Sequence, residues 1–271
     1  MPGLVDPSPR HPLQTEAASN GCFETMRAYR GRIFRLDGHL DRLYASASYL
    51  GTRAPDDRKR LRDRLLQALA RSGLREAVVR VALMPQPKAE AQLSLVVEPV
   101  RLPSPSSYRR GIRVAIVPAR KFDVGSIDPQ AKYSARLGSV LAVMDAQLRG
   151  VDEALFMDAL GYVTESTASN FVAIKDGAIL RPPCWLGLLA GITRDVLCEL
   201  AASLRIPIQE TPLTRHDVYN ADEAFLSSTI KEVLAVTSID GRRIGTGRPG
   251  PITKRLHRGF RRFVHRELNR Q

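Results

Sequence analysis

Two sets of strand-like and helix-like segments, separated by one irregular stretch, constrain the fold of this 271-residue chain most strongly. Before the stretch KFDVGSIDPQAK, the sequence predicts a strand hairpin, two amphipathic helices and three further strands. After it, helices alternate with hairpins up to a C-terminal helix. The stretch itself contains Gly and Pro but no regular apolar period, which is typical of a connector. The pattern predicts an α+β protein of two lobes that join near residue 120.

With 44% apolar residues, the chain can bury one large core or two smaller ones. We expect a flexible leader over residues 1–20, a small N-terminal domain over 21–120, a connector over 121–130 and a large C-terminal domain over 131–271. The leader lacks a basic segment followed by an apolar one, so it does not resemble a secretory signal. No run approaches the roughly 20 apolar residues that span a membrane, so we expect no membrane partner.

Local signals place individual elements within the two lobes. A hairpin turns at Arg30-Gly31, and a second hairpin turns at Asp176-Gly177. Asp37 is the expected N-cap of a helix that ends at Gly51, and another helix runs from about Asp56 to Ser72. The further expected strands are AVVRVAL, QLSLVVE, IRVAIV, IPIQE, EAFLSST and VLAVTSI, with helices over residues 136–148 and 193–204.

The chain is strongly basic, with 41 Lys and Arg against 28 Asp and Glu and a net charge of +13. This balance can indicate nucleic-acid binding, but arginines occur throughout the chain and aromatic residues make up only 6% of it. The densest basic run is the tail, ITKRLHRGFRRFVHREL, whose apolar residues share one helical face. That face comprises Ile252, Leu256, Phe260, Phe263 and Val264, and Arg255, Arg258, Arg261 and Arg262 lie off it. We expect a docked helix with a solvated basic face, and no nucleic-acid partner.

Three cysteines, Cys22, Cys184 and Cys198, lie far apart in apolar surroundings. An odd count without Cys-x-x-Cys spacing argues against both a disulfide framework and a zinc site. Reduced cysteines are typical of the cytosol. The sequence therefore predicts a cytoplasmic protein without a bound metal.

Glu165 is a single carboxylate in the small, uncharged run VTESTASNF of a basic chain. A solvent-exposed loop acid would account for it. The alternative is that Glu165 serves chemistry, because small neighbours would let a flat group approach it.

Lys132 lies where the connector meets an apolar helix, AKYSARLGSVLAV, in a chain that uses mostly arginine for its positive charge. A solvated lysine at a helix start is the simpler interpretation. A lysine partly desolvated at a domain join is more readily neutral, and its neutral amine can form an imine with a carbonyl.

Arg42 lies on the inner part of an amphipathic helix, in HLDRL. Its guanidinium could bind a phosphate through two parallel hydrogen bonds. It could equally pair with Asp41 or Glu24, and the sequence alone leaves these alternatives open.

Two further segments have groups that suit an anion. Gly191 precedes a helix whose first N–H groups, at Ile192 and Thr193, would be free to bind one. The hydroxyls of Ser228 and Thr229 end a strand and could face the same anion, although most such hydroxyls bond only the local backbone.

Five segments occur in order along the chain: HLDRLYASA, AKYSARLGSVLA, GYVTESTASNFVAIKDG, LLAGITRD and LSSTIKEV. Together they resemble the class IV (fold type IV) pyridoxal-phosphate enzymes, which include branched-chain aminotransferases, D-amino-acid aminotransferases and 4-amino-4-deoxychorismate lyase. The resemblance runs from about Gly21 to the stretch GRPGPIT and covers nearly the whole chain. It implies a small N-terminal α/β sandwich lobe and a larger C-terminal pseudo-barrel lobe. It also implies a homodimer, with the site between the domains and closed by a loop from the partner subunit.

The resemblance also implies roles for the candidate residues. Lys132 would hold pyridoxal 5'-phosphate as an internal Schiff base and move the proton between Cα and C4′. Glu165 would face the pyridine nitrogen and keep it protonated, so that the ring can accept electrons. The phosphate would be bound by Arg42, the backbone amides of Ile192 and Thr193, and the hydroxyls of Ser228 and Thr229.

Several departures bear on the substrate. Branched-chain aminotransferases usually show FEG, a Tyr five residues after the lysine, GSGEN and TGTA, where this chain has FET, Leu137, STASN and SSTI. That pattern disfavours a standard branched-chain enzyme. D-amino-acid aminotransferases match better, but their Arg-x-His pair is absent from VRVALMPQPKAEAQ and Phe23 replaces their Tyr. The candidate substrate residues are Phe23, Arg27 and Arg80, with Lys88 as a further cation.

The lyase shares the pattern GCF-x-T-x-R and an Arg-Leu pair after the lysine, here Arg136-Leu137. It uses the same cofactor and lysine but eliminates pyruvate to give 4-aminobenzoate. Because GITRD and the SST strand are more similar to transaminases, we expect an aminotransferase that acts on an amino acid and a 2-oxo acid, with the lyase as the alternative. A non-catalytic basic binding protein is disfavoured, since Lys132, Glu165 and Arg42 are all retained.

Overall fold

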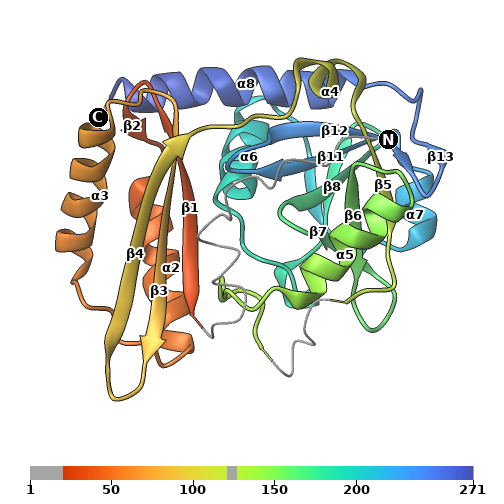
Figure 1. Cartoon of the computed structure of the whole chain (residues 1–271). Coiled ribbons are helices and arrows are strands. Elements are labelled where there is room, and N and C mark those ends of the chain that lie inside the picture. Colours follow the sequence, from red (N-terminus) through yellow and green to blue (C-terminus); the bar gives the residue numbers. More distant parts are fainter. Residues whose placement is uncertain (1–20, 121–126, 271) are drawn as a thin grey trace, which may run out of the picture.

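The computed structural model describes residues 21–120 and 127–270, in which two β-sheets lie side by side with helices around them (Figure 1). The expected leader over residues 1–20 and residues 121–126 of the expected connector lie outside the described part. The two sheets correspond to the two lobes that the sequence predicts, and the functional site depends on how they face each other.

The first sheet has four antiparallel strands in the order β2-β1-β3-β4. Its elements are β1 (Cys22–Tyr29), β2 (Arg32–Ile33), β3 (Ala77–Gln86) and β4 (Ala89–Pro99), with the helices α2 (Leu36–Tyr49) and α3 (Arg58–Ser72). Successive side chains of a strand point to opposite faces. In β1, Cys22, Met26 and Ala28 pack in one apolar core with residues of both helices. The alternate residues Phe23, Thr25, Arg27 and Tyr29 therefore point to the opposite face, towards the second sheet.

The second sheet has nine strands in the order β10-β9-β8-β11-β12-β5-β6-β7, with β13 paired to β12. Its strands are β5 (Ile112–Ile116), β6 (Glu153–Met157), β7 (Val163–Ser166), β8 (Asn170–Lys175), β9 (Ala178–Arg181), β10 (Ile208–Glu210), β11 (Glu223–Ser228), β12 (Glu232–Ile239) and β13 (Arg242–Arg243). Because β7 also pairs with β8, at Glu165 and Asn170, the sheet closes on itself. The expected pseudo-barrel lobe is confirmed.

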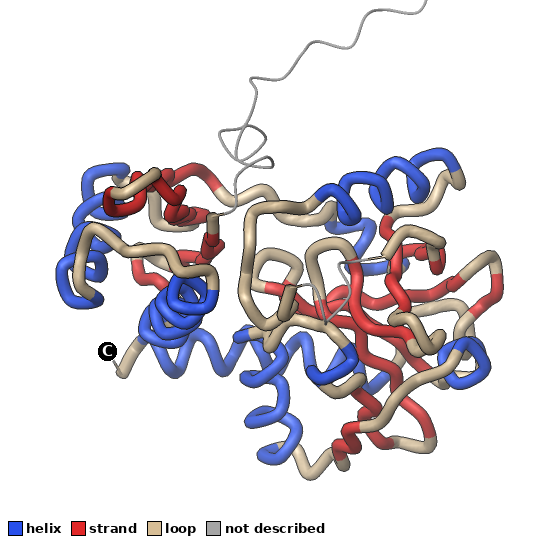
Figure 2. The backbone as a smooth tube through the Cα atoms, turned by 90° about the horizontal axis from the view of Figure 1, so that it is seen from below, coloured by secondary structure: helices blue, strands red, loops and turns tan. Residues whose placement is uncertain are grey.

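The remaining helices surround the second sheet, and the last of them contacts both sheet layers (Figures 1 and 2). They are α4 (Pro105–Arg110), α5 (Leu137–Leu148), the 3-10 helix η2 (Cys184–Leu186), α6 (Ile192–Ser203), α7 (Arg215–Tyr219) and α8 (Pro251–Leu268). Phe260 of α8 makes an edge-to-face contact with Phe34, at 5.9 Å between ring centroids, and Glu267 pairs with Arg35 at 2.8 Å. The expected docked C-terminal helix is confirmed, and it joins the two sheet layers.

Three local expectations differ from the structure. Strand β5 pairs in parallel with β6 and β12, so the chain crosses between the sheets before residue 112 and not near residue 120. Parallel pairing joins segments that are distant in sequence, and local patterns do not record it. The N-cap of α2 is Arg35 in a left-handed conformation, and Asp37 lies inside the first turn. The helices α4 and α7 were not predicted, because five or six residues are too few for a helical apolar period.

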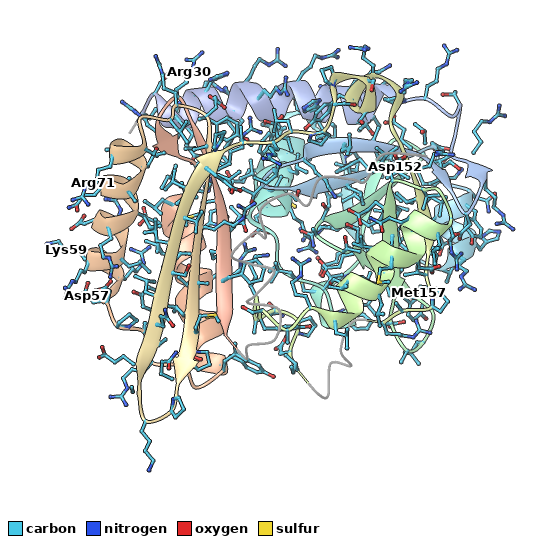
Figure 3. The ribbon with its side chains drawn as sticks, viewed as in Figure 1. Arg30, Asp57, Lys59, Arg71, Asp152 and Met157 are labelled. Atoms are coloured by element: carbon cyan, nitrogen blue, oxygen red, sulfur yellow. The ribbon has the colours of Figure 1, made fainter. Side chains whose placement is uncertain are left out.

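Basic side chains are distributed over the described surface. Lys59 and Arg71 on α3 and Arg30 in the β1–β2 turn point outward (Figure 3). The three cysteines are free thiols. Among residues 21–120 and 127–270, no group of His, Cys, Asp or Glu could hold a metal ion, and no helix has the length and apolar character to cross a membrane.

Candidate active site

A cavity of about 600 Å³ lies between the two sheets and brings together most of the residues that the sequence singled out. Its wall combines parts of β1 and α2 with α5, β7, the start of α6 and the end of β11. Eight of the ten candidate residues line it: Phe23, Arg42, Lys132, Glu165, Ile192, Thr193, Ser228 and Thr229. They come from distant parts of the chain, so the tertiary fold assembles them.

The main chain of Lys132 is anchored to the first sheet layer, and its side chain lines the cavity. The Phe23 N–H donates to the Lys132 carbonyl at 3.0 Å, and the Lys132 N–H donates to Ser46 Oγ at 3.0 Å. The next residue, Tyr133, forms a β-bridge with Cys22. Lys132 Nζ lies 4.8 Å from the centroid of the Phe23 ring. The amine is therefore held beside the face of the Phe23 ring. The main chain of Lys132 belongs to a short segment that pairs with the N-terminal end of β1.

Glu165 is a buried acid on β7 and does not lie in an exposed loop. Its Oε2 accepts a hydrogen bond from Asn170 Nδ2 at 3.0 Å and one from the Leu189 N–H at 3.3 Å. Asn170 lies opposite Glu165 on β8 and also donates to the Leu189 carbonyl at 2.8 Å. Asn170 thus fixes the carboxylate against the cavity wall. No role for Asn170 could be predicted from the sequence, because only the β7–β8 pairing shows that it faces Glu165.

The N-terminus of α6 opens onto the cavity. Its N-cap is Gly191, and no side chain caps the first turn. A Cβ atom at Gly191 would lie 2.0 Å from Asn170 Oδ1, so only glycine fits between the helix start and the asparagine. Because the first N–H groups of a helix have no intrahelical partner, those of Ile192 and Thr193 are suited to an anion.

Arg42 lines the cavity, and the buried acid Glu24 holds its guanidinium in place. Its Nε and Nη2 donate to the two oxygens of Glu24 at 2.6 and 2.9 Å, and Nη1 donates to the Ala190 carbonyl at 2.6 Å. This settles the alternatives for Arg42 in favour of Glu24 over Asp41. A guanidinium has five N–H groups, so two remain for a ligand.

The same acid also contacts His39, whose Nδ1 lies 2.8 Å from Glu24 Oε2. Burial alone would raise the pKa of Glu24, but the Arg42 charge and the His39 hydrogen bond lower it to about 2. Burial lowers the pKa of His39, so the histidine is neutral and Arg42 balances the charge of the carboxylate. A buried charge is tolerated when it is paired and hydrogen-bonded. Glu24 therefore fixes the orientation of Arg42.

Two further polar residues line the cavity beside Lys132. Partial burial, and then the charge of Glu165, raise the pKa of Tyr133 to about 12, so its hydroxyl stays protonated. Arg136 donates to the Thr167 carbonyl, and its guanidinium carbon lies 5.8 Å from the centroid of the Phe23 ring. Burial lowers the pKa of Arg136, but arginine remains charged at neutral pH. Arg136 therefore adds a second cation close to Phe23.

Arg27 and Arg80 do not line the cavity, and neither does Lys88. Arg27 forms a buried ion pair with Glu232, at 2.8 Å between Nη1 and Oε1. Arg80 pairs with Glu98 on the neighbouring strand, and Lys88 lies in the exposed β3–β4 turn. The fold therefore places these two candidate substrate residues, Arg27 and Arg80, outside the cavity and pairs each with a carboxylate of the same chain.

The sequence and the fold both match known proteins. The family model for class IV amino-transferases matches residues 21–239. A Methanocaldococcus jannaschii protein named as a candidate branched-chain-amino-acid aminotransferase is 37% identical over 249 residues, which cover 89% of this chain and 86% of that protein. The branched-chain-amino-acid aminotransferase of Pseudomonas aeruginosa is 33% identical over 254 residues, covering 89% and 82% of the two chains.

Solved structures of branched-chain aminotransferases also match the fold of this chain. The T.th. branched-chain amino acid aminotransferase, solved with pyridoxamine 5'-phosphate, superposes with a TM-score of 0.87 at 31% identity, covering 90% of this chain and 85% of that one. The Thermoproteus uzoniensis branched-chain aminotransferase with norvaline gives 0.84 at 30% identity, with coverage of 90% and 85%. The expected two-lobe fold is confirmed over nearly the whole described chain.

Proposed function

The chain belongs to the class IV aminotransferase family and is a pyridoxal-phosphate-dependent aminotransferase, and from this premise we propose that its amino donor is a branched-chain amino acid. One observation carries the proposal: the cavity that contains Lys132 and Glu165 also has an apolar wall. That wall comprises Phe23, Leu102, Leu137, Leu141 and Ile230. An aliphatic side chain is bound by removing such a surface from water.

The relatives named for branched-chain amino acids support the same substrate class. The motif departures disfavour a standard branched-chain enzyme, whereas the names of these relatives favour a branched-chain substrate. Leu137, which stands where those enzymes usually have Tyr, adds apolar surface to the cavity. The departure is therefore compatible with an aliphatic substrate.

The residues of the cavity fit pyridoxal phosphate. The uncapped start of α6, the hydroxyls of Ser228 and Thr229, and the guanidinium of Arg42 provide donors for a phosphate. Glu165, buried and held by Asn170, provides a carboxylate for a protonated ring nitrogen. These groups lie along one cavity with the amine of Lys132, and such a set is what the cofactor requires.

The proposed roles follow from this arrangement. When bound, pyridoxal phosphate supplies an electron sink for the electron pair that remains on the substrate Cα after its proton leaves. The amine of Lys132 takes that proton from Cα and later returns it. Glu165 holds the proton on the pyridine nitrogen, which keeps the ring able to accept electrons. Tyr133, protonated at neutral pH, is a hydrogen-bond donor beside the lysine.

Arg136 is our candidate for the substrate carboxylate, which the sequence left unassigned. It lines the cavity, and within the described part of the chain no carboxylate forms an ion pair with it. A half-buried guanidinium binds a carboxylate more strongly than an exposed one does. We expect Arg136→Gln to raise KM for the amino acid by about tenfold or more, because a bond to a charged group contributes roughly 1.5–3 kcal/mol, and Arg136→Lys to recover part of the loss.

We also propose that the enzyme is a homodimer, and the exposed face of α5 supports it. Leu137, Val140, Leu141, Met144 and Leu148 form an apolar stripe at helical spacing and are 47–88% exposed. Because Leu137 and Leu141 also line the cavity, a second copy on this stripe would border the site. Light scattering of Met144→Lys and Leu148→Lys tests this. A monomeric variant supports the stripe as the interface, and an unchanged dimer contradicts it.

Half-reactions test the substrate class most directly. The yellow enzyme is mixed with a panel of L- and D-amino acids, and loss of colour is followed without an acceptor. We expect rapid conversion by aliphatic amino acids, the stereochemistry being read from which isomer reacts, and a colourless Lys132→Ala variant as the control. Preference for acidic or aromatic donors would overturn the substrate proposal while leaving the family unchanged.

The lyase alternative has no better support than transamination. It is tested by supplying aminodeoxychorismate to the same preparation. Pyruvate and 4-aminobenzoate formed without any amino acceptor would favour the lyase. The cytoplasmic location also remains a proposal, to which the three free cysteines lend support.

A further inference from the structure

Glu232 is a buried acid that does not line the cavity but follows a segment that does. It is the first residue of β12, directly after the β11–β12 turn (residues 229–231), and it is 1% exposed. Its φ of +56° lies in the left-handed region, which residues with a Cβ seldom adopt. Such a conformation persists only where surrounding contacts hold it. The contacts of the Glu232 side chain are therefore the candidates for what holds the turn in place.

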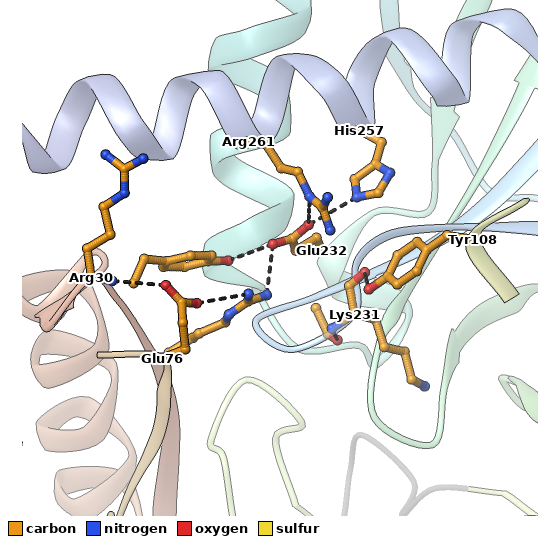
Figure 4. A network of polar contacts seen from close by, with 10 residues as sticks. Arg30, Glu76, Tyr108, Lys231, Glu232, His257 and Arg261 are labelled. Carbon is orange, nitrogen blue, oxygen red and sulfur yellow. Dashed lines mark hydrogen bonds and ion pairs between the residues drawn. The ribbon is translucent and has the colours of Figure 1, made fainter. Parts of the chain in front are cut away.

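Four donors surround the carboxylate, two on each oxygen (Figure 4). Oε1 accepts from Arg27 Nη1 at 2.8 Å and from Tyr29 Oη at 3.1 Å. Oε2 accepts from Arg261 Nε at 2.8 Å and lies 3.0 Å from His257 Nε2. The first pair of donors comes from β1 in the first sheet, and the second pair comes from α8. One carboxylate thus ties both of these elements to the end of the β11–β12 turn.

The turn has a second support from the segment between the two sheets. Tyr108 of α4 donates through its hydroxyl to the Lys231 carbonyl at 3.1 Å. Its ring stacks on His257, with 5.0 Å between centroids and 15° between planes. Within the turn, the Lys231 N–H donates to Ser228 Oγ at 3.2 Å. Side chains from β1, α8 and α4 therefore hold the C-terminal end of the turn, at Lys231 and Glu232.

Residues 227–231 all line the cavity, and so do Ile192 and Thr193 at the uncapped start of α6. Donors that are already in place bind an anion more tightly than donors that must first be ordered. Ser228 and Thr229 lie at one end of the turn, and Glu232 lies at the other. Because Glu232 does not line the cavity, its effect is transmitted through the main chain of the turn.

We propose that Glu232 is a positioning residue that holds the β11–β12 turn against β1 and α8, so that the turn is preorganised to bind a phosphate group. The proposal rests on the proposed function only in taking this turn as part of the phosphate site. It assigns to Glu232 a role in phosphate binding and none in the chemistry at Cα. Replacing Glu232 by Gln leaves the two donors on one oxygen unmatched, since an amide nitrogen cannot accept hydrogen bonds.

The test compares two forms of the cofactor that differ only in the phosphate. Full-length wild type and Glu232→Gln, depleted of cofactor, are titrated with pyridoxal 5'-phosphate and with pyridoxal, and binding is followed by absorbance. We expect Glu232→Gln to bind the phosphorylated form at least tenfold more weakly and to bind pyridoxal as the wild type does. Equal weakening of both forms would indicate general damage to the fold and would overturn the proposal, as would no change in either.

Glu76→Gln is the matched control. Glu76 belongs to the same network, with Oε2 3.5 Å from Arg27 Nη2 and Oε1 accepting from the Arg30 N–H at 3.0 Å, but it has no contact with the turn (Figure 4). It should bind both cofactor forms as the wild type does. A loss of phosphate-dependent affinity in Glu76→Gln that equals the loss in Glu232→Gln would overturn the assignment to Glu232.

A milder variant covers the case in which Glu232→Gln does not fold. Tyr29→Phe removes one of the four donors and keeps the ring, and we expect it to weaken phosphate-dependent binding about threefold with pyridoxal binding unchanged. No selective loss in Tyr29→Phe would overturn the proposal. The failure of the proposed function has a separate signature: the wild type would then prefer acidic or aromatic donors in the half-reactions, with both cofactor titrations unaffected.

Discussion

Glu24 and Glu232 are both buried acids next to the cavity, but the residues that bind them come from very different distances along the chain. Glu24 is bonded by His39 and Arg42, which lie 15 and 18 residues away in the same sheet layer. Glu232 is bonded from α8, 25 and 29 residues away, and from β1, 203 and 205 residues away. The first acid organises one layer, and the second joins two.

The difference shows two ways of preparing an anion site with a buried carboxylate. Glu24 contacts a cavity residue directly and fixes one guanidinium. Glu232 acts on a stretch of main chain and depends on donors from elements that only the complete fold brings together. Replacing Glu24 should therefore destabilise the first layer, whereas replacing Glu232 should change how the two layers pack together. The predictions below test this distinction.

The largest effect is expected for Glu24→Ala. This change leaves Arg42 without its buried counter-charge and removes the hydrogen-bond partner of His39. Removing one partner from a buried ion pair destabilises proteins by about 3–5 kcal/mol, and we expect the free energy of unfolding in urea to fall by that amount. Asp41→Ala is the control. Asp41 lies on α2 and is the exposed partner of Arg58 of α3, so its removal should leave the unfolding curve nearly unchanged. Similar curves for the two variants would show that Glu24 is not the organising acid of its layer.

Acid should weaken both carboxylate clusters. Burial opposes the shift, but the bound cations and hydrogen bonds lower the pKa of Glu24 and of Glu232 to about 2, below the value of about 4.3 for a free glutamate. Because the folded pKa is depressed, the stabilisation is fully present above about pH 4.3 and is lost as the pH falls towards about 2. At 1.36 kcal/mol per pKa unit, each acid contributes about 3 kcal/mol at neutral pH.

Replacing each acid by glutamine distinguishes the contributions of Glu24 and Glu232 to this pH dependence. Unfolding free energies of wild type, Glu24→Gln and Glu232→Gln are measured at several pH values between 7 and 2. Each variant should be less stable than the wild type at pH 7, and the gap should close as the pH approaches 2. A gap that stays constant down to pH 2 would mean that the charge of that carboxylate does not stabilise the fold.

The same contrast explains what the sequence could predict of the fold. Local signals predicted α3, from about Asp56 to Ser72, and the β8–β9 turn at Asp176-Gly177, because caps and turns depend on a few neighbouring residues. They did not place β5 in the second sheet, because its partners β6 and β12 are distant in sequence.

The candidate site shows the same limit. The resemblance to the family supplied Lys132 and Glu165, which line one cavity in the structure. Neither the resemblance nor local patterns supplied the partners that orient the site, such as Asn170 for Glu165. The pairing of Arg27 with Glu232 could not be predicted for the same reason, since the two residues lie 205 positions apart.

A smaller effect is expected for Arg42→Lys. A lysine ammonium cannot reproduce the two parallel bonds to Glu24 together with the bond to the Ala190 carbonyl. Titration with pyridoxal 5'-phosphate should show affinity reduced by about tenfold, since a good charged hydrogen bond contributes roughly 1.5 kcal/mol or more. Arg58→Lys, at the start of the neighbouring helix α3, is the exposed control. An affinity equal to that of the wild type would mean that Arg42 only completes the structure of the first layer.

The smallest effect is expected for Tyr108→Phe, and it tests whether the carboxylate or the main-chain bond sets the β11–β12 turn. The change removes the hydrogen bond to the Lys231 carbonyl but keeps the stack on His257. One such bond contributes about 1 kcal/mol, so we expect the unfolding free energy to fall by that amount and the affinity for pyridoxal 5'-phosphate to change by less than about threefold. If Tyr108→Phe weakened that affinity as much as Glu232→Gln, the main-chain bond would set the turn. Glu232 would then resemble Glu24, as an acid that stabilises its surroundings without shaping the anion site at a distance.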